Sequence, residues 1–139
     1  MKAKMTPFHV IIMIIAVQMT YGCQKINSEH DEAMSLEIKD IDFTSLKEGT
    51  YNGYYAGGMQ GWRENECMVT VNAISNDSGK VTEIKLIRSV EDREQSFFDE
   101  LYRRVIEKQS LQVDVISGAT LTSKAHLKSI EDALLKAER

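Results

Sequence analysis

Residues 67–90 read CMVTVNAISNDSGKVTEIKLIRSV, and this stretch decides the fold. Between residues 67 and 74, apolar side chains alternate with more polar ones, which is the period of a half-buried strand. The cluster Asn76-Asp77-Ser78-Gly79 is typical of a hairpin turn, and residues 81–90 return as a second strand. The sequence therefore predicts an antiparallel hairpin here.

The segments on either side of the hairpin complete an α+β domain. Upstream, residues 50–56 read TYNGYYA and are rich in strand-forming residues. Downstream, residues 94–108 and 122–136 repeat apolar side chains at the three- and four-residue spacing of helices. We therefore expect a small antiparallel sheet with packed helices, as a single domain over residues 46–139.

The N-terminus has the order of a secretory signal peptide. Lys2 and Lys4 give it a positive start, and the apolar run VIIMIIAV follows at residues 10–17. This run is much shorter than the roughly 20 residues of a membrane-spanning helix, and small residues come after it. We therefore predict a signal peptide at residues 1–22 and an exported protein.

The residues around Cys23 resemble the lipobox of bacterial lipoproteins. The run is Thr20-Tyr21-Gly22-Cys23, in which Thr20 stands where leucine is usual. We predict that Cys23 carries lipid and that residues 23–45 form a flexible tether, because this range begins polar and without periodicity. The expected location is the cell membrane or the outer membrane, facing the periplasm or the exterior. An ordinary signal peptide with an incidental cysteine is the alternative.

The second cysteine, Cys67, has two possible states. If Cys23 is lipidated, Cys67 has no partner and behaves as a small hydrophobic residue with a free thiol. A Cys23–Cys67 disulfide is the other possibility, since export would permit it. Two cysteines alone do not decide between these states.

The overall charge limits the kinds of partner. The 139 residues include 17 basic and 21 acidic side chains, a formal net charge of −4, and no basic stripe. We therefore expect no nucleic-acid partner. The histidines and cysteines have no spacing typical of a metal site, so no metal ligand is predicted.

Residues 114–122, DVISGATLT, carry the chemistry. A strand-like piece enters a glycine turn and a helix leaves it, so the first helix amides point at the turn from the positive end of the helix dipole. Gly118 and Ala119 let a ligand approach the backbone, and the neighbouring Ser and Thr hydroxyls add donors. Such a place suits a phosphate. From local physics alone, ordinary helix capping by Ser or Thr is the commoner explanation.

The string Asp114-x-x-Ser117-Gly118-Ala119-Thr120-x-Thr122 resembles the flavinylation motif of the FMN-binding domain family. That family includes subunits of sodium-pumping and related ion-pumping respiratory complexes, and many small exported lipoproteins. Residues 47–53, KEGTYNG, are similar to the opening strand of the family, which reads Gly-x-Tyr-x-Gly. The resemblance covers about residues 47–137 and implies a single FMN-binding domain.

The resemblance implies a covalent cofactor. In the family, the threonine that matches Thr120 accepts FMN through a phosphoester. A separate exported flavin transferase supplies the FMN from FAD, with magnesium, and recognises the motif. Asp114 matches the acid of that motif, so we expect it to act in recognition by the transferase or in the geometry of the turn, and not in redox chemistry. The remaining expected cofactor-binding residues are Ser117, Gly118, Ala119, Leu121 and Thr122.

The resemblance also implies electron transfer. We expect a carrier without a substrate of its own, which passes electrons between a membrane redox complex and another donor or acceptor. The alternative is a reversible FMN-binding sensor or accessory module without covalent flavin, and a third reading is a purely structural lipoprotein domain. Trp62, in a glycine-flanked loop, is the better candidate for an aromatic wall of the flavin site. Tyr51, Tyr54 and Tyr55 are also candidates, but for most of them sheet packing is the preferred explanation.

Overall fold

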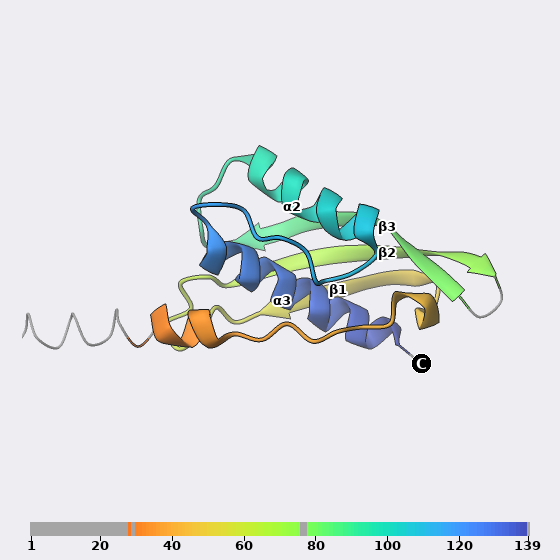
Figure 1. Ribbon diagram of the computed structural model, residues 1–139, viewed down its shortest axis with the longest axis horizontal. Coiled ribbons are helices and arrows are strands. Elements are labelled where there is room, and N and C mark those ends of the chain that lie inside the picture. Colours follow the sequence, from red (N-terminus) through yellow and green to blue (C-terminus); the bar gives the residue numbers. More distant parts are fainter. Residues whose placement is uncertain (1–27, 29, 76–77, 139) are drawn as a thin grey trace, which may run out of the picture.

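The computed structural model describes residues 28, 30–75 and 78–138 (Figure 1). The predicted signal peptide and Cys23 lie outside these residues. The elements follow in the order η1 (Phe43–Ser45, a 3-10 helix), β1 (Gly49–Tyr55), β2 (Asn65–Ser75), β3 (Ser78–Ser89), α2 (Gln95–Lys108) and α3 (Thr120–Ala137). The three strands form one antiparallel sheet in the order β1-β2-β3, which confirms the predicted hairpin and the α+β class.

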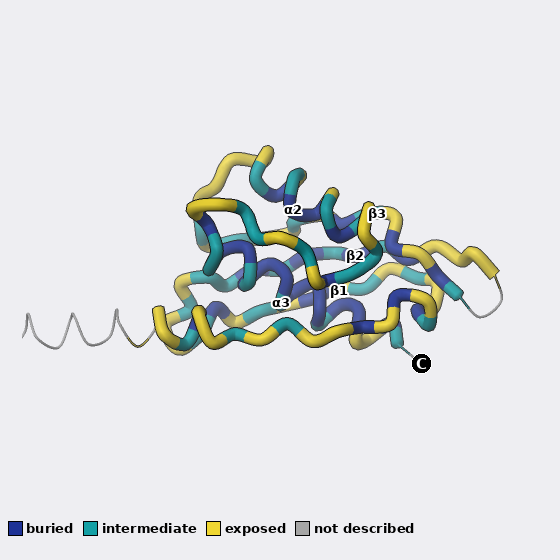
Figure 2. Tube along the Cα trace, viewed as in Figure 1, coloured by how far each residue is buried: buried dark blue, intermediate teal, exposed yellow. Residues whose placement is uncertain are grey.

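Both helices pack on the same face of the sheet and enclose one core (Figure 2). In β2, Cys67, Val69 and Val71 are buried while the residues between them are half-exposed, because successive side chains of a strand point to opposite faces. The helices bring the apolar stripes that the sequence predicted. These stripes are Phe98, Leu101, Tyr102 and Val105 in α2, and Leu127, Ile130 and Leu134 in α3.

Gly53 sets how closely α3 approaches the sheet. A Cβ atom at this position would lie 1.8 Å from the Ser129 carbonyl oxygen and 2.8 Å from the Ala133 Cβ. Since no side chain fits there, glycine is required in the middle of β1 where the helix crosses it. The position of α3, and with it the position of residues 114–122, depends on this contact.

The chain upstream of β1 lies along α3, and we call residues 30–46 the strap. Within the range predicted as a tether, residues 30–35 are helical, and the strap then runs to η1 near the C-terminal end of α3 (Figure 1). Lys124 Nζ donates to the carbonyl oxygens of Met34 (2.7 Å) and Leu36 (3.1 Å), and the Lys39 N–H donates to Glu131 Oε2 (3.0 Å). The side chains of Ile41, Phe43 and Leu46 are buried. From Met34 onward the strap is therefore packed on the domain.

Side chains cover both edges of the sheet. At β1, the Tyr54 N–H donates to Asp132 Oδ2 (2.9 Å) of α3. At β3, the Gln109 side chain pairs with the Val81 backbone: its Oε1 accepts from the N–H (2.9 Å), and its Nε2 donates to the carbonyl oxygen (2.8 Å). Because unpaired strand edges can pair with the strands of other chains, these contacts help to protect both edges of the small sheet from such pairing.

Cys67 is a free thiol in the structure and is fully buried. Burial raises the pKa of this thiol to about 11, so it is neutral and unreactive near pH 7. This is the state expected when Cys67 has no partner.

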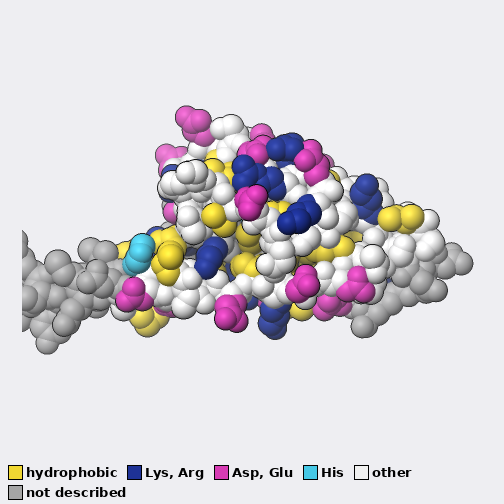
Figure 3. Space-filling model, viewed as in Figure 1, with side chains coloured by type: hydrophobic (Ala, Val, Ile, Leu, Met, Phe, Trp, Pro, Cys, Tyr) yellow, Lys and Arg dark blue, Asp and Glu magenta, His cyan; other side chains and the backbone are white. Residues whose placement is uncertain are grey.

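The surface carries charges of both signs. On the face seen in Figure 3, acidic and basic side chains are interspersed, and several form ion pairs along α2, such as Arg103–Glu100 (2.8 Å) and Arg104–Glu100 (2.9 Å). None of the described helices combines the length and the apolar character that crossing a bilayer requires.

Candidate functional site

The motif of residues 114–122 lies where an extended segment turns into α3. Gly118 has a φ of 75°, a left-handed conformation that favours glycine, and the Ala119 N–H donates to the Ile116 carbonyl oxygen (3.0 Å) across the turn. Helix α3 begins at Thr120, two residues earlier than the sequence predicted. Thr120 is therefore the first helical residue, and its N–H has no acceptor within the helix.

The Ser and Thr side chains of the motif do not cap this helix. Ala119 occupies the N-cap position, and no side-chain cap hydrogen bond is made there among the described residues. The Ser123 hydroxyl instead donates to the Ala119 carbonyl oxygen (2.8 Å) and accepts from the Ile116 N–H (3.1 Å), so it fixes the turn. Ordinary capping therefore does not explain the motif, and the amides at the start of α3 are left for an anion.

A pocket of about 470 Å³ opens at this end of α3. It is formed by the strap, the loop before β2, the loop after β3 and the start of α3. The residues that line it are His30, Met34, Arg63, Glu91, Arg93, Gly118, Ala119, Thr120, Leu121 and Thr122. The predicted residues 118–122 are therefore brought together in one place, next to two arginines and a glutamate.

Glu91, Arg93 and Arg63 are pocket residues that the sequence did not reveal. The Thr122 hydroxyl donates to Glu91 Oε1 (3.0 Å) and accepts from Arg93 Nη2 (3.3 Å). The Arg93 guanidinium also lies over the Phe97 ring, 6.0 Å from its centre. These hydrogen bonds join residues 31 and 29 positions apart, so no local pattern in the sequence indicates them.

The other predicted site residues do not line the pocket. Ser117 is exposed in the turn. Asp114 is also exposed, as recognition by another protein would require, and its backbone carbonyl oxygen accepts from Arg104 Nη1 (2.7 Å). Trp62 is 46% exposed in the loop before β2. Tyr51 packs partly against the core, in agreement with the sheet-packing explanation.

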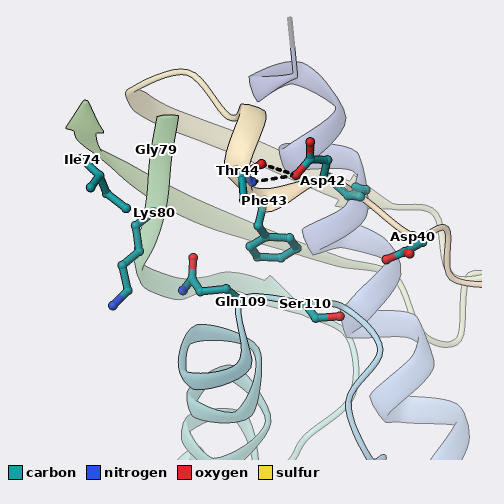
Figure 4. Close-up of a pocket in the computed structure, with 10 residues that line it drawn as sticks. Asp40, Asp42, Phe43, Thr44, Ile74, Gly79, Lys80, Gln109 and Ser110 are labelled. Atoms are coloured by element: carbon teal, nitrogen blue, oxygen red, sulfur yellow. Dashed lines mark hydrogen bonds between the residues drawn. The ribbon is translucent and has the colours of Figure 1, made fainter. Parts of the chain in front are cut away.

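A larger hollow, of about 750 Å³, lies near the opposite end of α3, between η1, β3 and the C-terminal end of α2 (Figure 4). The side chains of Asp42 and Gln109 in this hollow already have partners within the protein. The Asp42 carboxylate accepts from the Thr44 hydroxyl (2.6 Å) and N–H (2.9 Å), and these hydrogen bonds lower the pKa of Asp42. The Gln109 amide is paired with Val81. This hollow therefore offers a ligand few groups that still need a partner.

Comparison with known families gives the family of the chain. The model of the family described as FMN-binding domain matches residues 61–135, which is more than half of the chain. The chain belongs to the FMN-binding domain family. A search of curated proteins gave no match, and a search of solved structures gave none either.

The pocket of this FMN-binding domain has groups that fit the cofactor. A phosphate would find the amides at the start of α3 and the guanidinium groups of Arg63 and Arg93. A Cβ atom at Gly118 would meet nothing within 4 Å, so the backbone is open to a ligand there. Glu91 Oε2 is buried and has no hydrogen-bond partner in the described part of the chain. The family shows a flavin-binding protein, and this pocket offers donors suited to a phosphate together with an acceptor that has no partner among the described residues.

Proposed function

We propose that this protein is an extracytoplasmic electron carrier whose FMN is linked to Thr120 by a phosphoester. One observation carries the proposal: Thr120 is the first residue of α3 and lines the pocket beside amides that no side chain caps. Its side chain is half-exposed, so another protein can reach the hydroxyl. Bound FMN supplies one- or two-electron transfer, which is the chemistry of the cofactor.

The covalent step requires FAD as donor and the flavin transferase as partner. The Thr120 hydroxyl oxygen bonds to the FMN-side phosphorus of FAD. The bond from that phosphorus to AMP breaks, AMP leaves with the bonding electrons, and the hydroxyl proton passes to water. Asp114, exposed six residues before Thr120, is the proposed recognition residue for the transferase.

The pocket supports the linked phosphate by charge. The phosphoester keeps one negative charge, which the positive end of the α3 dipole and the two arginines stabilise. A covalent bond also has a purpose outside the cytoplasm, because a dissociable cofactor would be lost to a dilute medium by mass action. The linkage and the exported location therefore support each other.

Mass spectrometry of the intact protein tests the linkage. The chain is produced together with a flavin transferase, alongside Thr120→Ala and the matched control Thr70→Ala on the outer face of β2. The parent chain and Thr70→Ala should gain the mass of FMN less one water, and Thr120→Ala should gain nothing. If Thr120→Ala gains the same mass, the proposed linkage is wrong.

Reversible FMN binding is the second candidate, because the arginines and the uncapped amides would serve it equally well. In that case yellow protein would lose its flavin on denaturation, and Thr120→Ala would bind as much FMN as the parent chain. A structural domain that binds no flavin would be colourless both before and after denaturation.

Export and lipidation rest on the order of the N-terminal segments: a basic start, a short apolar run and Cys23. We propose that the lipid on Cys23 holds the domain at a membrane, where a membrane redox complex exchanges electrons with the flavin. Fractionation of cells that express the parent chain and Cys23→Ser checks this. The parent chain should be in the membrane fraction and Cys23→Ser should be released from it, and equal release of both would contradict lipidation.

A further inference from the structure

Glu91 is an acidic residue in a pocket whose arginines and helix amides suit an anion, so phosphate binding does not explain its role. It follows β3 in the chain, and its N–H donates to the Ser89 hydroxyl oxygen (3.2 Å), so the backbone is held in place. Its Oε1 accepts from the Thr122 hydroxyl (3.0 Å), and Thr122 is only 2% exposed. The carboxylate is therefore held by the Thr122 hydroxyl at the wall of the pocket, on a backbone that is itself held by Ser89.

The second carboxylate oxygen of Glu91 needs a hydrogen-bond donor. Glu91 Oε2 is buried and meets no donor among the residues that the structure describes. A buried carboxylate oxygen without a partner costs free energy, and native proteins nearly always satisfy such groups. Because Glu91 lines the pocket, a ligand in the pocket is the natural source of the missing donor.

The chemistry of FMN narrows the choice of donor. The phosphate carries negative charge and no donor hydrogen at neutral pH, so a carboxylate repels it. The remaining donors are the ribityl hydroxyls and the ring N–H. Thr122, which holds Glu91, lies two residues from Thr120 in the first turn of α3, so the carboxylate is close to the place proposed for the phosphate. The ribityl chain is the part of FMN attached directly to the phosphate.

We propose that Glu91 Oε2 accepts a hydrogen bond from a ribityl hydroxyl of the flavin, and that Thr122 and Arg93 are positioning residues for this carboxylate. The proposal rests on FMN binding in this pocket but not on the phosphoester to Thr120. It also gives the last residue of the motif a role. The Thr122 hydroxyl has its hydrogen directed to Glu91 and its oxygen facing Arg93, so it acts through Glu91.

Flavin titrations test the contact in a Thr120→Ala background, where no covalent bond forms. Riboflavin has the ribityl chain, whereas lumiflavin has the same ring with a methyl group in its place. Glu91→Leu should weaken riboflavin binding by roughly ten- to a hundredfold, the usual effect of losing a hydrogen bond to a charged group, and should leave lumiflavin binding within about threefold. Glu94→Leu, an exposed neighbour outside the pocket, is the matched control and should change neither.

Two results of these titrations would overturn the proposal. Equal weakening of both flavins by Glu91→Leu would place the carboxylate against the ring. Unchanged binding of both would mean that Glu91 does not touch the flavin. Neither result depends on whether Thr120 carries the phosphoester, so this proposal and the proposed linkage can fail separately.

Thermal unfolding separates a ligand contact from a structural role. Without flavin, the Tm of Glu91→Leu combines two opposed changes, the loss of the hydrogen bond from the Thr122 hydroxyl and the removal of a buried oxygen that lacks a partner, so the test is the rise in Tm on loading. With covalent FMN on an intact Thr120, the rise in Tm on loading should be smaller in Glu91→Leu than in the parent chain. If Glu91→Leu lowers the Tm of the flavin-free protein and leaves the rise on loading unchanged, Glu91 has a structural role and the proposal is wrong.

Discussion

The two ends of α3 differ in a way that volume does not explain. The hollow near its C-terminal end is the larger, at about 750 Å³ against about 470 Å³, yet its Asp42 and Gln109 side chains have partners within the protein. The pocket at its N-terminal end has amides that no side chain caps and a carboxylate oxygen that meets no donor in the described residues. Groups that still need a partner, rather than empty space, are the reason why we propose the N-terminal pocket as the flavin site.

The largest effect is expected where both ends of α3 are disturbed together. Gly53→Ala would place a Cβ 1.8 Å from the Ser129 carbonyl oxygen, so the helix must move off the sheet. We expect a loss of about 3 kcal/mol in the free energy of unfolding, together with weaker FMN binding. Urea unfolding and flavin titration measure the two effects, with Asn52→Ala on the outer face as control. Unchanged stability would show that α3 can shift freely on the sheet. The cavities at its two ends would then not be fixed by this contact.

The second effect should be confined to the far end. Gln109→Ala leaves the N–H and carbonyl of Val81 without their side-chain partner, which should cost about 2 kcal/mol of stability. FMN affinity should not change, because the larger hollow has no part in binding. Lys80→Ala, an exposed residue of the same hollow, is the control and should leave both quantities unaffected. A loss of FMN affinity in Gln109→Ala would break the distinction between the two ends.

The third effect lies between the two ends and depends on pH. His126 is fully buried in α3, its Nδ1 lies 3.0 Å from the Tyr102 hydroxyl, and burial lowers its pKa from 6.5 to about 4. The unfolded chain therefore binds a proton first as the pH falls. Stability contributed by neutral His126 is fully present above pH 6.5 and is lost as the pH drops toward 4, by up to about 1.4 kcal/mol per pH unit.

Urea unfolding of the parent chain and His126→Gln at pH 7, 6 and 5 measures this contribution. Glutamine keeps an acceptor for the Tyr102 hydroxyl but does not titrate. The stability of the parent chain should therefore fall more steeply between pH 7 and pH 5 than that of the variant. Parallel pH dependence in the two proteins would mean that His126 does not titrate on unfolding in this range.

The smallest effect on stability should accompany a clear effect on the flavin. Gly118→Ala has space for the added methyl, but a φ of 75° strains a residue with a side chain by about 1 kcal/mol. The methyl would also obstruct ligand approach at the pocket wall, so FMN loading by the transferase should decrease. Gly61→Ala is a matched control with a φ of 68° and no place in the pocket, where the added Cβ would make only an ordinary contact, 3.7 Å from the Ala56 carbonyl oxygen. Equal loading of the two variants would contradict a flavin contact at the Gly118 backbone.

The sequence predicted the elements whose signal is periodic and missed those that depend on contacts across the chain. The hairpin of β2 and β3 follows from a two-residue alternation, and the buried stripes of both helices follow from helical spacing. Helix α3 begins two residues earlier than the sequence predicts, because its N-cap residue, Ala119, has no polar side chain that would indicate a helix start. The motif residues 118–122 were predicted as a group, and they share one pocket.

Other parts of the site lay beyond any local pattern. Glu91 and Arg93 join the pocket only because the end of β3 and the start of α3 are brought together by the fold of the sheet and helices. Lys124, which the sequence places within one turn of the motif, donates instead to two carbonyl oxygens of the strap. Lys124, the basic residue nearest to the motif in the sequence, therefore holds the strap instead of facing the pocket.

The path of the strap determines which end of the domain would face the membrane in a chain anchored through its N-terminal segment. Residues 30–36 lie beside the flavin pocket, where His30 and Met34 form part of its wall, and the strap then leads away toward the far end of α3. If Cys23 is lipidated and FMN binds in this pocket, as we propose, the cofactor lies at the end of the domain nearest the bilayer. The flavin and a redox complex in the same membrane would then meet by diffusion in two dimensions. A short tether would keep their effective concentration high.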